Sequence, residues 1–200
     1  MNCINEKRQV VDYNTYETRE INLIKSYIQP DDCVLELGAR YGGTSIACNL
    51  LLKDKTKQVS VEPDSRVWKS LEENKKKSQC QFTILKGTIS KEPQKIIKNS
   101  RQFSDGNDWA TYTEPASGYS PERVENYPIP LLPFNVLIAD CEGFLETFYN
   151  ENKNFFKGLR LIILEKDRPD FCNYDRLKQE FLNLGFFCAR DEFHSVYIKP

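Results

Sequence analysis

The sequence predicts an α/β fold, in which a mostly parallel sheet carries helices on both faces. Short apolar runs alternate with segments whose apolar residues recur at helical spacing. A strand over 33–37 ends in glycines and precedes a helix over 46–51, and a strand over 59–61 precedes a helix through 67–71. A third strand follows at 82–85. Such alternation is typical of parallel strands joined by crossover helices.

The same rhythm returns in the second half of the chain. Strands are expected over 135–139 and 159–164, with a helix around 145–149 between them. A last helix over 177–184 stops at Gly185, and two short apolar runs then predict an antiparallel C-terminal hairpin.

Two segments do not follow this rhythm. Residues 1–30 are expected to form a helical N-terminal segment, because Ile21, Ile24 and Ile28 make one apolar face that ends at Pro30. Residues 100–133 are rich in Gly, Pro, Ser, Asn and Tyr, and long connections of this kind are usually functional or disordered. We expect a lid whose aromatic residues Trp109 and Tyr112 stack on an acceptor molecule.

Composition narrows the class of protein. Two hundred residues suit one domain over 1–200, and 28 basic against 29 acidic residues give a net charge of -1, which does not favour nucleic acid as the partner. The seven cysteines are scattered, so we expect reduced thiols and a cytoplasmic protein. No apolar run approaches the roughly 20 residues of a membrane span. The oligomeric state is not predicted.

The clearest motif follows the first strand and opens a helix. It reads Glu36-Leu37-Gly38-Ala39-Arg40-Tyr41-Gly42-Gly43. A dinucleotide site would need Gly-x-Gly-x-x-Gly, and Arg40 occupies the second glycine position. Glu36 suits a cationic ligand better than a pyrophosphate, since S-adenosylmethionine carries an ammonium and a sulfonium group. The motif therefore favours the methyl donor over a nicotinamide cofactor.

Further donor contacts are expected after the second and third strands. Glu62 ends the second strand and Asp64 follows it, and both are expected at the donor, because an acid at this position can accept both hydroxyls of a ribose. The alternatives are that Glu62 is an exposed strand end and that Asp64 only caps the next helix. Gly87, Thr88 and Ile89 follow the third strand, where adenine would lie.

Acidic residues end the fourth and fifth strands. Asp140 and Glu142 follow one strand, and Glu165 and Asp167 end the other. Asp140 has two alternative roles: a general base whose pKa Glu142 raises, or a ligand of Mg²⁺ or Mn²⁺ together with Glu165 and Asp167. Solvated loop acids are the third alternative. His194, the only histidine, could also act as a base if the terminal hairpin folds over the cleft.

Taken together, these motifs resemble the FkbM-type family of methyltransferases. The resemblance covers about residues 30–170 and is carried by Glu36-Leu37-Gly38-Ala39, Glu62-Pro63, the run 140–144 and Ile162-Ile163-Leu164-Glu165. It implies a Rossmann-like class I fold, with a mostly parallel seven-stranded sheet, and methyl transfer to oxygen, often to sugar hydroxyls of glycans or metabolites. The family usually has Asp at position 36, and commonly Lys where this chain has Ile138.

The resemblance also assigns residues to the site. It implies that Glu36, Gly38, Ala39, Tyr41, Glu62 and 87–89 line the donor, while Asp140 and Glu142 face the transferred methyl group.

Other functions compete with sugar O-methylation. A non-sugar hydroxyl could be the acceptor, with a divalent metal at Asp140 and Glu165. A Rossmann oxidoreductase is a further alternative, but this chain lacks the third phosphate-binding glycine that such an enzyme needs. The end of the fourth strand also lacks the motifs of methyltransferases that act on amino groups or carbon atoms of nucleic-acid bases. A non-catalytic binding module on the same fold remains an alternative.

Overall fold

The computed structural model describes residues 2–13, 15, 17–98 and 111–199. At its centre is a seven-stranded sheet with the order β12-β13-β11-β10-β3-β4-β5. Strand β13 runs antiparallel to both of its neighbours, whereas the pairs from β11 to β5 are parallel. The predicted fold is therefore confirmed, including the C-terminal hairpin. The strands are β3 (Val34–Leu37), β4 (Gln58–Val61), β5 (Thr83–Leu85), β10 (Val136–Ala139), β11 (Leu161–Glu165), β12 (Phe187–Arg190) and β13 (His194–Ile198).

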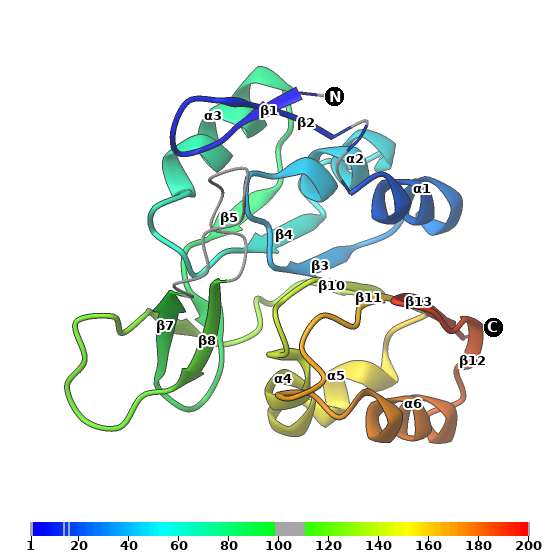
Figure 1. Cartoon of the computed structure of the whole chain (residues 1–200). Coiled ribbons are helices and arrows are strands. Elements are labelled where there is room, and N and C mark those ends of the chain that lie inside the picture. Colours follow the sequence, from blue (N-terminus) through cyan, green and yellow to red (C-terminus); the bar gives the residue numbers. More distant parts are fainter. Residues whose placement is uncertain (1, 14, 16, 99–110, 200) are drawn as a thin grey trace.

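Helices cover both faces of this sheet (Figure 1). One layer consists of α1 (Thr18–Tyr27), α2 (Gly43–Leu51) and α3 (Trp68–Lys77), and the other of α4 (Leu145–Glu151), α5 (Lys153–Lys157) and α6 (Tyr174–Asn183). Successive side chains of a strand point to opposite faces, so each strand contributes to two cores. In β3, Val34 joins the core that contains Ile24 of α1, and Leu35 joins the core that contains Phe181 of α6.

The N-terminal segment is helical only in part. Strands β1 (Asn2–Ile4) and β2 (Val10–Asp12) form an antiparallel hairpin, and α1 begins only at Thr18. Asn74 of α3 holds the hairpin, since its side chain accepts from the Ile4 N–H and donates to the Ile4 carbonyl, both at 2.9 Å. The prediction of a helical segment over 1–30 was thus wrong for its first half. The residue that holds this half, Asn74, lies 70 positions away from Ile4 in the sequence.

The expected lid over 100–133 is also partly regular structure in its described part. Strand β8 (Thr111–Pro115) pairs antiparallel with β7 (Gln94–Lys98), and β9 (Asn126–Tyr127) pairs with β6 (Thr88–Ile89). The β7–β8 ribbon projects to one side of the central sheet (Figure 1). Thr and Tyr, which begin β8, are strand formers, and this explains why a structureless loop was the wrong expectation there. Trp109 lies outside the described residues.

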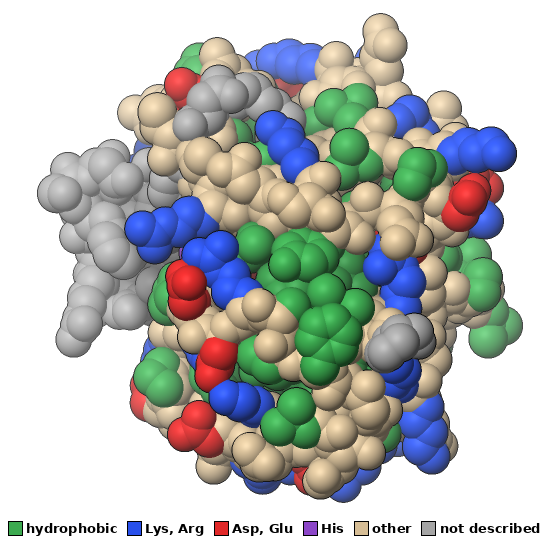
Figure 2. Space-filling model, turned by 90° about the vertical axis from the view of Figure 1, so that its right-hand side faces the viewer, with side chains coloured by type: hydrophobic (Ala, Val, Ile, Leu, Met, Phe, Trp, Pro, Cys, Tyr) green, Lys and Arg blue, Asp and Glu red, His purple; other side chains and the backbone are tan. Residues whose placement is uncertain are grey.

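The β12 edge of the sheet presents hydrophobic side chains to the surface. Figure 2 shows such side chains gathered at the centre of this face. Phe187, on the edge strand β12, is half exposed.

Within the described parts of the chain, no helix has the length and apolar character needed to span a membrane.

Candidate functional site

A pocket opens at the carboxyl ends of the parallel strands. From β3 the chain builds β4 and β5 on one side, whereas β10 and β11 lie on the other, so the strand order reverses between β3 and β10. Open α/β sheets bind their ligands at such a point. Nine residues predicted for the site line this pocket: Gly38, Glu62, Gly87, Thr88, Ile89, Tyr112, Asp140, Glu142 and Glu165.

The turn after β3 lets the backbone form one wall. Gly38 has a φ of 91°, and a Cβ there would lie 1.6 Å from the Asp140 carbonyl oxygen. Only glycine allows the ends of β3 and β10 to approach so closely. Arg40 follows with a φ of 46°, and its N–H donates to the Glu62 carboxylate at 2.7 Å.

Glu62 directly follows β4, and backbone N–H groups hold both of its carboxylate oxygens. It is 4% exposed, and its second carboxylate oxygen accepts the Asp64 N–H at 2.7 Å. Burial raises the pKa of Glu62 to about 7. A carboxylate offers about four lone-pair sites, so two remain for hydroxyl groups of a ligand.

The opposite end of the pocket is shaped by β6 and β8. At Gly87, a Cβ would lie 2.2 Å from the Glu125 carbonyl oxygen, and Thr88 donates from its hydroxyl to Asn126 at 3.0 Å. The Arg168 guanidinium lies 4.5 Å from the centre of the Tyr112 ring. These contacts hold the wall of the pocket at which adenine and the acceptor are expected.

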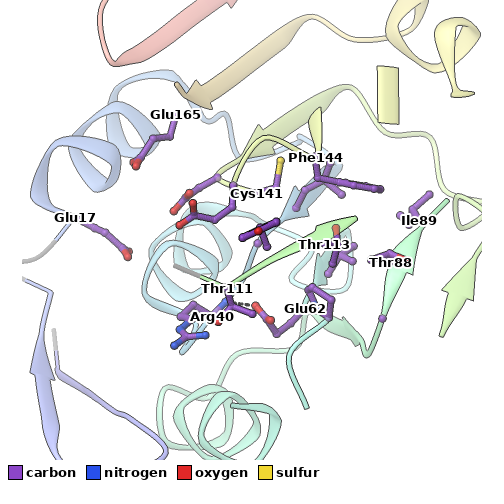
Figure 3. A pocket seen from close by; sticks show the side chains of 18 residues that line it. Glu17, Arg40, Glu62, Thr88, Ile89, Thr111, Thr113, Cys141, Phe144 and Glu165 are labelled. Carbon is purple, nitrogen blue, oxygen red and sulfur yellow. Dashed lines mark hydrogen bonds between the residues drawn. The ribbon is translucent and has the colours of Figure 1, made fainter. Parts of the chain in front are cut away.

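Acidic side chains form the remaining end. Figure 3 shows Glu17 and Glu165 on this side and Thr88 and Ile89 on the other, with Arg40 bonded to Glu62 between them. Burial raises the pKa of Glu17 to about 8 and that of Glu142 to about 7.

Asp140 lies within this acidic end, and its pKa is raised well above the usual range. Burial is the main cause, followed by the charges of Glu20 and Glu165 and then by those of Asp167 and Glu17. The raised pKa was expected from the charge of Glu142, whereas the largest contributions come from burial and from other acids. Glu17 and Glu20 belong to the α1 region, which strand-end motifs do not connect with the site.

Some predicted residues do not line the pocket. Glu36, Ala39, Tyr41, Asp64 and His194 lie outside it. Glu36 is 1% exposed and accepts hydroxyl hydrogen bonds from Thr44 and Ser45 of α2. Its carboxylate therefore points beneath the pocket and ties the end of β3 to α2.

The other four have structural partners nearby. Ala39 is buried in the core, and the Tyr41 hydroxyl donates to Glu6. Asp64 pairs with Arg40 at 3.1 Å and with Arg66 at 2.7 Å. His194 begins β13 opposite Glu165 of β11.

Asp167, the third acid considered as a metal ligand, is occupied by the chain itself. Its carboxylate accepts N–H groups from Glu142 and Gly143, and the Tyr174 hydroxyl donates to it at 2.7 Å. It therefore shapes the loop after β10.

Several lining residues were not predicted. They are Glu17, Leu37, Arg40, Val61, Pro63, Thr111, Thr113, Cys141 and Phe144. For α1, a signal was present: Glu20 is buried in the same helix face as Ile21 and Ile24. An acid inside an apolar helix face is unusual enough to indicate a site.

Comparisons with known proteins agree with the topology. No protein-family model matches the chain, and no curated protein sequence does. Among solved structures, a precorrin-6y C5,15-methyltransferase from Geobacter metallireducens GS-15 has a TM-score of 0.53 at 12% identity, over 94% of this chain and 86% of that one. A methyltransferase from Pyrococcus furiosus also gives 0.53, at 14% identity over 91% and 82%.

An rRNA methylase from Streptococcus thermophilus gives a TM-score of 0.50 at 8% identity, over 90% of this chain and 94% of that one. At these identities the similarity shows the fold alone. The chain has the Rossmann-like fold of class I methyltransferases, and membership of the FkbM-type family stays a prediction.

Proposed function

We propose that the protein is an S-adenosylmethionine-dependent O-methyltransferase, with a sugar hydroxyl of a glycan or glycosylated metabolite as the acceptor. The observation that carries the proposal is the pocket at the switch point of a methyltransferase-type sheet, with Glu62 at one strand end and Asp140 at another. In this arrangement, carboxylate oxygens of Glu62 can accept hydrogen bonds from ribose hydroxyls, and the carboxyl group of Asp140 lies beside the proposed position of the transferred methyl group.

The donor half of the pocket is proposed to lie between β3, β4 and β6. The backbone at Gly38 would approach the methionine part, Glu62 would accept the ribose hydroxyls, and Gly87 to Ile89 would contact adenine. Glu36 is assigned a positioning role, because Thr44 and Ser45 bind its carboxylate beneath the turn.

The acceptor half is proposed to lie at Asp140 and Tyr112. S-adenosylmethionine, when bound, would supply the methyl group to the acceptor oxygen and leave as S-adenosylhomocysteine, and Asp140 would take the hydroxyl proton. Burial and the neighbouring acids raise the pKa of Asp140, so its carboxylate holds a proton more firmly than an exposed one, and the positive sulfonium of a bound donor would favour the ionised form that the step needs. The resemblance to the FkbM-type family supports a sugar acceptor, and the Tyr112 ring at the pocket wall is compatible with stacking on a sugar.

Calorimetry with S-adenosylhomocysteine and with NAD tests the donor. We expect binding of the first and none of the second, and the reverse result would end the proposal. Asp140→Asn should abolish turnover while retaining S-adenosylhomocysteine affinity, whereas the matched variant Asp170→Asn, at an exposed loop position, should keep both. Near-normal turnover of Asp140→Asn would remove Asp140 from the mechanism.

A further inference from the structure

Three side chains from separate elements converge behind the acidic end of the pocket. Glu20 comes from α1, Glu165 from the end of β11 and His194 from the start of β13. One ligand atom from each, two carboxylate oxygens and an imidazole nitrogen, lie within 4.8 Å of one another. Glu165 Oε2 is 2.8 Å from His194 Nε2. We call these three residues the Glu20 triad.

Glu20 has a carboxylate oxygen that the chain leaves unsatisfied. The residue is 1% exposed, and its Oε2 has no hydrogen-bond partner. Among the described residues, no lysine or arginine forms an ion pair with it. An unpaired buried carboxylate is costly, and natural structures relieve such a group with a proton or a cation.

We propose that Glu20, Glu165 and His194 bind a divalent transition-metal ion. The three ligands supply both carboxylate oxygen and imidazole nitrogen, and ions such as Mn²⁺, Fe²⁺ and Zn²⁺ accept this mixture, whereas Mg²⁺ and Ca²⁺ prefer oxygen alone. The site differs from the one expected from sequence, since it uses Glu20 and His194 in place of Asp140 and Asp167.

The site borders the pocket through Glu165. Glu165 lines the pocket together with Asp140, while Glu20 and His194 lie behind it. Three protein ligands leave coordination positions free, as in catalytic metal sites. A role for the ion in orienting an acceptor oxygen beside Asp140 rests on the proposed function, but binding of the ion does not.

Mn²⁺ is the probe, because thiolates do not favour it and the chain carries seven cysteines. The full chain is first freed of metal with a chelator. It is then titrated with Mn²⁺ in the absence of donor and acceptor, and electron paramagnetic resonance measures the free Mn²⁺ at each step. We expect one ion per chain. Glu20→Gln and His194→Gln should each weaken Mn²⁺ binding about tenfold or more. The matched variant Glu72→Gln, at an exposed carboxylate of α3 outside the pocket and the triad, should leave Mn²⁺ affinity unchanged.

A second measurement needs no variant. Because His194 is the only histidine, the imidazole resonances of the wild-type chain report on one residue, and bound Mn²⁺ should broaden them. The proposal would be overturned if the imidazole resonances stayed sharp at saturating Mn²⁺ or if Mn²⁺ did not bind. It would also be overturned if all three variants lost Mn²⁺ affinity equally. Its failure is distinct from failure of the proposed function, because S-adenosylhomocysteine binding is measured without the ion.

Discussion

Replacing Glu62 by glutamine tests how the pocket binds the donor. Both Glu62 carboxylate oxygens accept backbone N–H groups, from Arg40 and Asp64, and the proposed ribose contact adds two hydroxyls. Glu62→Gln removes the charge and replaces one acceptor oxygen by a donor. The loss of a charged acceptor costs about 1–3 kcal/mol. The dissociation constant for S-adenosylhomocysteine should therefore rise about 5- to 150-fold.

The pH dependence of binding carries the same reasoning further. Burial raises the pKa of Glu62 to about 7, and only the ionised carboxylate can accept from two N–H groups and two hydroxyls together. If the ligand binds the ionised form alone, affinity should fall about tenfold between pH 8 and pH 6. In Glu62→Gln the contribution of this group should be lost, since the amide does not titrate, and only the dependence due to other pocket acids such as Glu17 and Glu142 should remain.

Calorimetry at pH 6, 7 and 8 on the wild type and Glu62→Gln separates these effects. The matched control is Glu72→Gln, which removes an exposed carboxylate of α3. The reasoning is refuted if the wild type and Glu62→Gln show the same slope with pH, or if the affinity of Glu62→Gln at pH 8 equals that of the wild type.

Three further predictions follow from the site and its turns. Gly38→Ala should lower the free energy of unfolding by about 3 kcal/mol or more, because its Cβ would meet a backbone oxygen at 1.6 Å, whereas Gly158→Ala, with its nearest atom at 3.7 Å, should change little in the same urea titration. Burial raises the pKa of Glu17 to about 8 and of Glu142 to about 7, so the ligand-free protein favours their neutral forms. Stability should therefore fall as pH rises from about 4.5, the ordinary pKa of a glutamate, to about 8, so the melting temperature should be higher at pH about 5 than at pH about 8. The opposite trend would contradict the burial of these acids. Tyr112→Ala should raise the acceptor KM and leave S-adenosylhomocysteine affinity intact, and loss of donor affinity alone would place Tyr112 in the donor half.

The sheet could be predicted because its strands carry continuous apolar runs. In β3 and β10 the residues point alternately into the two cores, so both faces are apolar and the runs stand out from the amphipathic helices. The β1–β2 hairpin left no comparable signal, because each strand has three residues and Asn74 binds it from 70 positions away. Long-range contacts of this kind are invisible to local periodicity.

The site was predictable where it depends on strand ends. The carboxyl ends of parallel strands meet at one edge, so Glu62, Asp140 and Glu165 could be placed together from sequence. The position of Glu36 could also have been inferred, since Val34 and Glu36 share a face and Val34 faces the core beside α2. Glu17 and Glu20 reach the site only through the packing of α1 on the sheet.

The acids around the pocket divide by what balances their charge. Burial alone would raise the pKa of Asp64, but hydrogen bonds and charge from Arg66, and the charge of Arg40, keep it below its usual value. Asp64 is therefore ionised and holds Arg40, which in turn donates to Glu62 and fixes the donor side. At the other end, burial raises the pKa of Asp140, and the nearby acids raise it further. The ionised Asp64 thus fixes the turn that holds Glu62, whereas a carboxyl group whose charge is unfavourable can take up a proton or lie beside a cation. This asymmetry supports our proposal that the methyl group is transferred at the Asp140 end.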